Sequence, residues 1–192
     1  SIAALSSEDK ANIDHINRLA HRVIELEEAK NTLTKWADIF QHAHWGIAIH
    51  LGTSTTFELI NPAFESLYGY TSKEMKQVTV PDLFAPESLP ILQQAQADAF
   101  ERGYGVFEAL HRRKDGSVFP VQIELIVVKN DQGEILYHIA NVWDQTEKKA
   151  AQERLLLKRF ALDHIKEGVF LIDEYSMFHY VNEGACRSLG YT

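Results

Sequence analysis

Few side chains in this 192-residue chain have the types and spacing that catalysis or metal binding requires. His42 and His44 could form a metal-binding pair, but no third ligand lies at a suitable spacing. Asp163 and His164, beside Glu167, look like an acid–base set, but we interpret them as the solvated face of a helix. The sequence contains no phosphate-binding loop of the form G-x-x-x-x-G-K-[ST], no nucleophile elbow, and no kinase ATP-site or cyclase motif. We therefore expect this stretch to be non-catalytic and to hold no metal.

The composition is typical of a soluble globular protein, with 45% hydrophobic and 24% charged residues. A formal net charge of −8 argues against a nucleic-acid partner, because phosphates attract a basic face. Cys186 is the single cysteine, which rules out an internal disulfide and fits a reducing compartment, so we expect a cytoplasmic location. No run approaches the length of a membrane span, so a membrane anchor would lie elsewhere in a longer parent protein.

A sequence repeat organises the chain. Residues 60–71 read I-N-P-A-F-E-S-L-Y-G-Y-T, and residues 181–192 read V-N-E-G-A-C-R-S-L-G-Y-T. Asn61 and Asn182 occupy the same place in the two copies, each ahead of a short helix that ends at Gly-Tyr-Thr. We expect one complete module followed by the opening of a second, cut from a longer receptor.

Residues 7–40 have the pattern of one long helix. Apolar residues recur at alternating spacings of three and four, which is a heptad seam with Lys30 as its one polar position. This seam consists of Ile16, Leu19, Val23, Leu26, Lys30, Leu33, Ala37 and Phe40. Two interpretations remain open: a parallel coiled coil with a second copy, or a helix packed on its own domain.

The elements between the long helices alternate in a recognisable order. Two strands are expected in 45–60, short helices between Asn61 and Gly103, and three strands at 106–113, 118–128 and 135–143. A second long helix follows at about 146–165. This β-β-α-α-α-β-β-β order predicts an α+β fold: a five-stranded antiparallel sheet with short helices on one face, flanked by long N-terminal and C-terminal helices.

Three segments resemble the PAS family of sensor domains. They are I-N-P-A-F-E-S-L-Y-G-Y-T-S-K-E-M (60–75), R-R-K-D-G-S-V-F-P-V-Q-I-E-L (112–125) and D-Q-G-E-I-L-Y-H-I-A-N-V-W-D-Q-T-E-K-K (131–149). The resemblance covers about 36–147 and resumes at 160–192. It divides the chain into a heptad helix (1–35), a PAS domain (36–146), a helical linker (147–160) and the truncated start of a second PAS domain (161–192).

The resemblance implies a sensory or dimerising module of a bacterial signalling protein, with a histidine kinase or diguanylate cyclase as the downstream output domain. In such proteins a D-x-T motif relays the signal into the following helix, and here that motif comprises Asp144 and Thr146. Asp144 could equally be a plain helix cap. The alternative function is a ligand-free PAS scaffold that serves only dimerisation and spacing.

The resemblance also bears on cofactors. The positions that hold flavin in related photoreceptors correspond to His111, Val121 and Val142, two of which are aliphatic, and no cysteine lies in 74–84. The stretch 87–102, where haem-binding relatives carry their ligand, has no histidine. We therefore expect neither flavin nor haem, and leave a small-molecule ligand open.

Strand alternation assigns side chains to the inner face of the sheet. His111 and His138 are the unusual members of this face, because two imidazoles would face a mostly apolar cavity. They could hydrogen-bond a carboxylate or another small polar ligand, or they could be core histidines satisfied by backbone, water or each other. The expected inner face comprises Phe107, Ala109, His111, Val121, Ile123, Leu125, His138, Ala140 and Val142.

The outer face of the sheet is expected to be apolar as well. Its members are Ile126, Ile135, Tyr137, Ile139, Asn141 and Trp143. An apolar outer face needs a cover. We predict that Trp36 and Phe40 pack over it, and that a homodimer forms through this face and the N-terminal helix.

Overall fold

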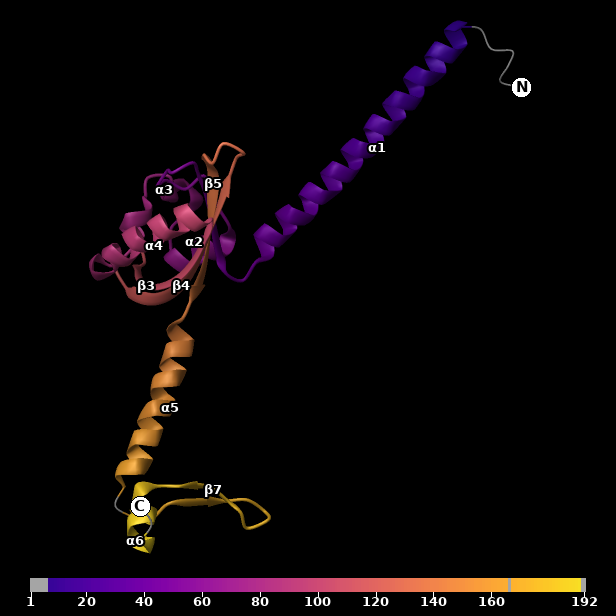
Figure 1. The fold of residues 1–192 in the computed structure, drawn as a ribbon. Coiled ribbons are helices and arrows are strands. Elements are labelled where there is room, and N and C mark those ends of the chain that lie inside the picture. Colours follow the sequence, from indigo (N-terminus) through magenta and orange to yellow (C-terminus); the bar gives the residue numbers. More distant parts are fainter. Residues whose placement is uncertain (1–6, 166, 191–192) are drawn as a thin grey trace.

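The computed structural model describes residues 7–165 and 167–190. A single α+β domain sits between two long helices, α1 (Ser7–His42) and α5 (Thr146–His164), which leave it in different directions (Figure 1). The predicted fold class is confirmed. No helix in the described part of the chain is long and apolar enough to cross a membrane.

The sheet has five antiparallel strands in the order β2-β1-β5-β4-β3. The last strand in sequence, β5, is therefore the central strand, between β1 and β4, and β2 and β3 are the edge strands. The strands are β1 (Gly46–Leu51), β2 (Leu59–Ile60), β3 (Tyr104–Arg112), β4 (Val118–Lys129) and β5 (Ile135–Asp144).

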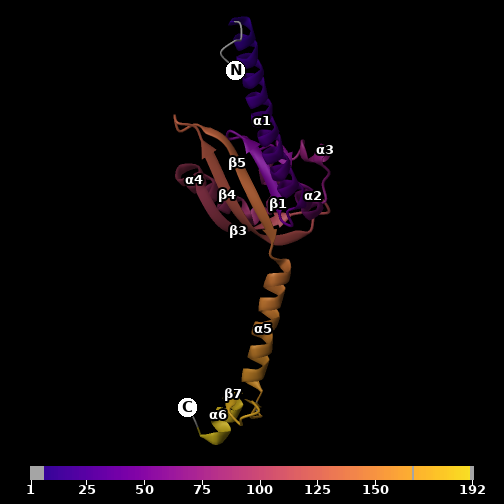
Figure 2. The same ribbon diagram turned by 90° about the vertical axis from the view of Figure 1, so that its right-hand side faces the viewer.

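Short helices cover one face of this sheet, and the other face is open toward the side from which α1 leaves (Figures 1 and 2). The covering elements are α2 (Pro62–Tyr68), α3 (Ser72–Met75), the 3-10 helices η2 (Val80–Leu83) and η3 (Pro86–Ser88), and α4 (Leu89–Arg102). The core lies between these helices and the sheet and is centred on Phe64, Tyr68, Met75 and Val121, all nearly inaccessible to solvent.

Local sequence signals explain the helix boundaries. Asn61 is the N-cap of α2, and Pro62 follows at a position where its missing N–H costs nothing. Gly69 ends α2 with φ of 75°, a left-handed conformation that glycine adopts without steric cost. Thr71 and Glu74 form a capping box at the start of α3.

The asparagine of the repeat ties a strand to a helix. Asn61 is fully buried, its Oδ1 accepts from the backbone N–H of Ile47 (2.8 Å) and Phe64 (2.9 Å), and its Nδ2 donates to the carbonyl of Trp45 (3.0 Å). One side chain therefore satisfies three backbone groups, from β1, from α2 and from the residue before β1.

The second copy of the repeat builds the same arrangement. Its helix is α6 (Glu183–Leu189), and the paired strands β6 (Phe170–Ile172) and β7 (Phe178–Val181) precede that helix, at the far end of α5 (Figure 1). Asn182 is also fully buried, accepts from the N–H of Val169 (2.8 Å) and Ala185 (2.9 Å), and donates to the carbonyls of Leu162 (2.8 Å) and Glu167 (3.0 Å). The repeat thus encodes a shared local structure.

Candidate functional site

A cavity of about 50 Å³ lies inside the domain, between the inner face of the sheet and the covering helices. Most of its lining is aliphatic or aromatic, and His50, Tyr68, Gln96 and His111 are its polar members. The lining comprises Ala48, His50, Phe57, Phe64, Tyr68, Val80, Leu83, Phe84, Leu92, Gln96, Phe107, His111, Ile123, Leu125, Ala140 and Val142. Within the expected inner face, the residues predicted to line a ligand pocket are His111, His138, Phe107, Val121, Ile123, Ala140 and Val142. Five of these seven are in the lining, whereas Val121 and His138 are buried outside it.

His111 is 3% exposed and forms a short hydrogen bond with the hydroxyl of Tyr68 through Nδ1. Burial lowers the pKa of His111 to about 3 and raises the pKa of Tyr68, so both side chains are neutral near pH 7. The Nε2 atom of His111 is buried and has no hydrogen-bond partner among the described residues.

The protonation state of this pair follows from counting donors. If the hydroxyl of Tyr68 donates to Nδ1 of His111, the imidazole carries its proton on Nε2, and that N–H is the one group left unpaired. If Nδ1–H donated instead, both the hydroxyl proton and the Nε2 lone pair would lack partners. The first arrangement is therefore favoured, and it places a buried, unpaired N–H donor of His111 in the cavity wall.

His138 pairs with His50 and not with His111. The two rings stack across β1 and β5, with centroids 4.6 Å apart and an interplanar angle of 7°. Each Nδ1 donates to a backbone carbonyl, from His50 to Thr56 (2.9 Å) and from His138 to Gly52 (3.0 Å). Burial, and for His50 also the neighbouring His138, lowers both pKa values, that of His50 to about 4.

Sequence reasoning did not identify His50 as a site residue. Strand alternation places His50 on the same face as Ala48, two residues earlier, so its inward position could have been predicted. Its pairing with His138 could not, because that depends on the register of β1 against β5. His138 has a backbone partner for Nδ1, as the core-histidine interpretation required, whereas His111 retains an unpaired nitrogen.

The junction between the domain and α5 is held by a network around Arg113. Its guanidinium forms an ion pair with Asp144 (Nη2 to Oδ2, 2.7 Å) and donates through Nη1 to the carbonyl of Leu67, near the end of α2. The same guanidinium lies 3.6 Å from the centroid of the Phe119 ring. Asp144 Oδ1 in turn accepts from the backbone N–H of Thr146 (2.7 Å), the first residue of α5.

Two further contacts fix the first turns of α5. Gln145 occupies the N-cap position, and its backbone N–H donates to the carbonyl of Pro120 (2.9 Å). Lys149 forms an ion pair with Glu108 of β3 (2.7 Å). Partial burial alone would raise the pKa of Asp144, but the hydrogen bonds from Thr146 and the charge and hydrogen bond of Arg113 outweigh it, so the pKa is lowered.

The outer face of the sheet is only partly covered. Trp45 stacks on Trp143, with ring centroids 6.0 Å apart, and donates through Nε1 to Asn141 Oδ1 (3.2 Å). Beside them Ile126 and Ile139 form a half-buried cross-strand pair. The tryptophan that covers this face is therefore Trp45, which follows α1.

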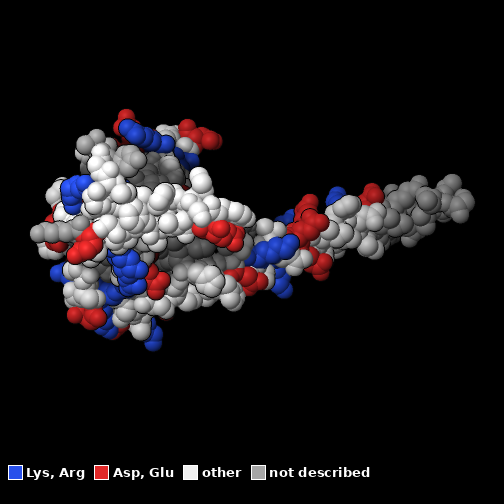
Figure 3. Space-filling model, turned by 90° about the horizontal axis from the view of Figure 1, so that it is seen from below, with Lys and Arg blue, Asp and Glu red and all other residues white. Residues whose placement is uncertain are grey.

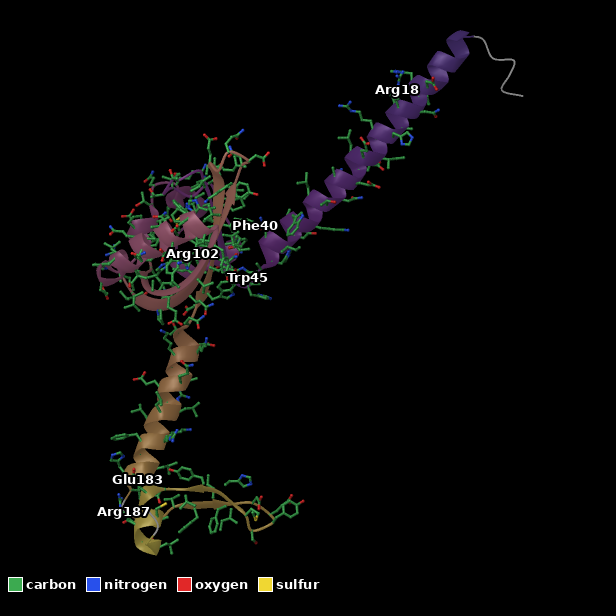
Figure 4. All side chains as sticks on the ribbon, in the orientation of Figure 1. Arg18, Phe40, Trp45, Arg102, Glu183 and Arg187 are labelled. Atoms are coloured by element: carbon green, nitrogen blue, oxygen red, sulfur yellow. The ribbon has the colours of Figure 1, made fainter. Side chains whose placement is uncertain are left out.

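The prediction that Trp36 packs over the outer face is wrong for the single chain, because Trp36 is 65% exposed. Helix α1 points away from the domain, so only its last turns are near the sheet (Figures 1 and 4). Phe40, in those last turns, is half-buried, and it lies with Trp45 where α1 meets the domain, far from Arg18 on the outer part of the helix (Figure 4). Acidic and basic side chains are interspersed along α1 in the view from below in Figure 3.

Comparison with known proteins identifies the fold. A family model for PAS domains matches residues 46–147, and a second PAS model matches residues 156–192. The chain therefore belongs to the PAS domain family, and it is a PAS sensory domain related to sensor histidine kinases.

The similar proteins include a sensor histidine kinase and PAS domains of known structure. The chain is 29% identical over 167 residues to the sensor histidine kinase TmoS of Ectopseudomonas mendocina, an alignment that covers 79% of this chain and 16% of that kinase. The PAS domain of a Colwellia psychrerythraea protein has a TM-score of 0.56 at 19% identity, covering 60% of this chain and 98% of that one. A sensory box histidine kinase/response regulator from Burkholderia thailandensis has a TM-score of 0.54 at 19% identity, covering 67% and 97%. These structural likenesses show the fold alone.

Proposed function

We propose that this chain is a non-catalytic sensory module of a multidomain signalling protein. In this proposal, a ligand in the internal cavity changes the position of helix α5, and we call this coupling the relay. The relationship to a sensor histidine kinase favours a histidine kinase as the output domain, with a diguanylate cyclase as the alternative. The observation that carries the proposal is the position of Arg113, which bonds both α2, the helix that lines the cavity through Phe64 and Tyr68, and the junction with α5.

The relay follows a continuous set of contacts. Helix α2 lines the cavity through Phe64 and Tyr68, and the carbonyl of Leu67 in the same helix accepts a hydrogen bond from Arg113. Arg113 bonds Asp144, and Asp144 bonds the first N–H of α5. A shift of α2 therefore changes the position of the guanidinium, whose planar fork fixes the geometry on both sides. Because the ion pair is partly exposed, its role is positional, and its contribution to stability is at most about 1 kcal/mol.

We propose that the cavity holds neither flavin nor haem. An engineered cavity that binds benzene measures about 150 Å³, and the cavity here is about 50 Å³. Val121 and Val142, at the positions that would contact a flavin ring, are aliphatic and buried. The residues present fit a much smaller ligand.

We also propose that two copies of the chain pair through α1. Its apolar seam is exposed in the single chain, with 62% of Ile16, 63% of Leu26 and 69% of Leu33 accessible. A helix of 36 residues that projects from its domain gains stability chiefly from a partner along such a face. A scaffold that only dimerises is the competing function, and it predicts that changes at Arg113 leave α5 unaffected.

Hydrogen exchange measured by mass spectrometry tests the relay. Arg113→Gln removes the charge and shortens the fork, so exchange in the first turn of α5 should accelerate about fivefold, in line with the loss of about 1 kcal/mol. Lys114→Gln is the matched control, because Lys114 forms an equally short ion pair with Glu74 (2.7 Å) that does not touch α5. Equal exchange in the first turn of α5 for wild type and Arg113→Gln would contradict the relay.

A further inference from the structure

We propose that the cavity binds a small neutral molecule that has one hydrogen-bond acceptor atom on a short apolar body, and that the acceptor bonds Nε2–H of His111. This inference rests on the proposed function, in which the cavity is the sensing site. It identifies the chemical class of the ligand, and His111 as the residue that selects it.

The unpaired donor defines the polar end of the ligand. His111 lines the cavity, its Nδ1 is engaged by Tyr68, and its Nε2–H has no partner among the described residues. A buried donor without a partner is unfavourable, so an acceptor atom placed there gains more than it would at a surface. Carbonyl, hydroxyl and ether oxygens all meet this requirement.

The rest of the lining defines the body of the ligand. Phe84 lies against the imidazole of His111, with ring centroids 4.1 Å apart, and Phe64 and Ile123 contribute further apolar wall. A single water could accept from Nε2–H, but a buried water is held by two to four polar partners. The other polar members of the lining are His50, Gln96, which is half-buried, and Tyr68, whose hydroxyl is engaged by His111, and the remaining wall is apolar. A molecule with one acceptor and an apolar remainder matches the wall better than water does.

Charge excludes carboxylates. His50 and His111 are neutral, and the nearby guanidinium of Arg113 is engaged by Asp144 and Leu67 outside the lining. An anion in the cavity would be desolvated without a counter-charge, which is strongly unfavourable. The carboxylate that the sequence left open is therefore not the favoured ligand.

Size restricts the ligand to a few heavy atoms, because the cavity is about 50 Å³. Acetone, acetate and isobutene are suitable probes, since each has four heavy atoms in a planar trigonal arrangement. They differ in the property at issue: acetone is a neutral acceptor, acetate is an anion, and isobutene is apolar. Comparing them separates hydrogen bonding, charge and shape.

The test uses the full chain with 15N-labelled histidine, and follows the His111 ring signals by NMR during titration with each probe. We expect acetone to shift the Nε2–H signal and to bind about tenfold more tightly than isobutene, as one satisfied buried donor implies, with acetate weaker still. In His111→Phe, which keeps a ring against Phe84, acetone should lose this advantage over isobutene. His138→Phe is the control, because His138 lies outside the lining, and it should retain the preference.

The inference is overturned if isobutene binds wild type as tightly as acetone, if acetate binds as tightly as acetone, or if acetone leaves the Nε2–H signal unchanged. The comparison of probes on wild-type protein decides the matter even if His111→Phe does not fold. The exchange experiment on Arg113→Gln needs no ligand, so the relay and the ligand class can fail separately.

Discussion

Replacing Asn61 by alanine tests how much of the domain depends on one side chain of the repeat. The substitution removes the acceptor for the N–H groups of Ile47 and Phe64 and the donor for the carbonyl of Trp45. It therefore detaches β1 from the start of α2 at a site that is fully buried.

The magnitude follows from the surroundings of each partner. An unpaired buried N–H costs about 1–3 kcal/mol. Phe64 is 2% exposed and its N–H cannot recover a water, but it keeps a bond to the backbone carbonyl of Asn61 (3.0 Å), so its loss lies at the low end of that range. Ile47 and Trp45 are half-buried and partly recover hydration, so their losses lie at the low end of that range. The total is about 3 kcal/mol, a large share of the 5–15 kcal/mol typical of a domain. With a urea dependence of about 2 kcal/mol per molar, the unfolding midpoint should fall by about 1.5 M.

Tryptophan fluorescence during urea unfolding measures this loss in the first domain alone, because all three tryptophans (Trp36, Trp45 and Trp143) precede the second copy of the repeat. Asn182→Ala is the matched control: it removes an equivalent set of hydrogen bonds from the second copy, so the fluorescence midpoint should stay unchanged. A midpoint shift below about 0.5 M for Asn61→Ala would refute the reasoning, as would an equal shift for Asn182→Ala.

Two further predictions concern pH and assembly. The pKa values of His50 and His111 fall from 6.5 to about 4 and about 3 on folding, so the unfolded chain binds protons first, and stability is full above about pH 6.5 and is lost as the pH falls toward 4. The free energy of unfolding, measured by urea titration between pH 7 and 4.5, should decline by about 1.4 kcal/mol per pH unit for each histidine, and His50→Phe should reduce the slope. A flat profile contradicts the neutral core. Leu26→Arg places a charge in the α1 seam and should shift sedimentation at tens of micromolar toward monomer, whereas Glu28→Arg, two residues away and outside the seam, should not; a wild-type protein that is already monomeric there removes the proposed dimer.

The boundaries of the elements were predictable because their signals are local. Asn61 with Pro62, Gly69, and the pair Thr71 and Glu74 each act within a few residues of their own position, and each has the role that its sequence context indicates. The inner and outer faces of the strands followed from the two-residue period in the same way, except at Ile135. Ile135 is predicted on the outer face but packs against Leu125 and Val127 of the inner face, because the register of β4 against β5 shifts between Val128 and Lys129.

Contacts between distant strands were not predictable on these grounds. His50 stacks on His138 because β1 lies beside β5, and neither residue carries a sign of that register. The cover of the outer face was misassigned to Trp36 for a related reason. The direction in which α1 leaves the domain is set by the chain after His42, and it is Trp45 in that segment that reaches Trp143.

The two copies of the repeat differ in one respect that matters for a relay. Asn61 donates to Trp45, which lies beyond the end of α1 at His42, whereas Asn182 donates to the carbonyl of Leu162 within α5 itself. Helix α5 is therefore held at both ends, by Asp144 at its first residue and by Asn182 in its last turn. In the proposed relay, a movement of the junction is transmitted by a rigid helix straight to the second copy, because one hydrogen bond joins that helix to the side chain around which the next module is built.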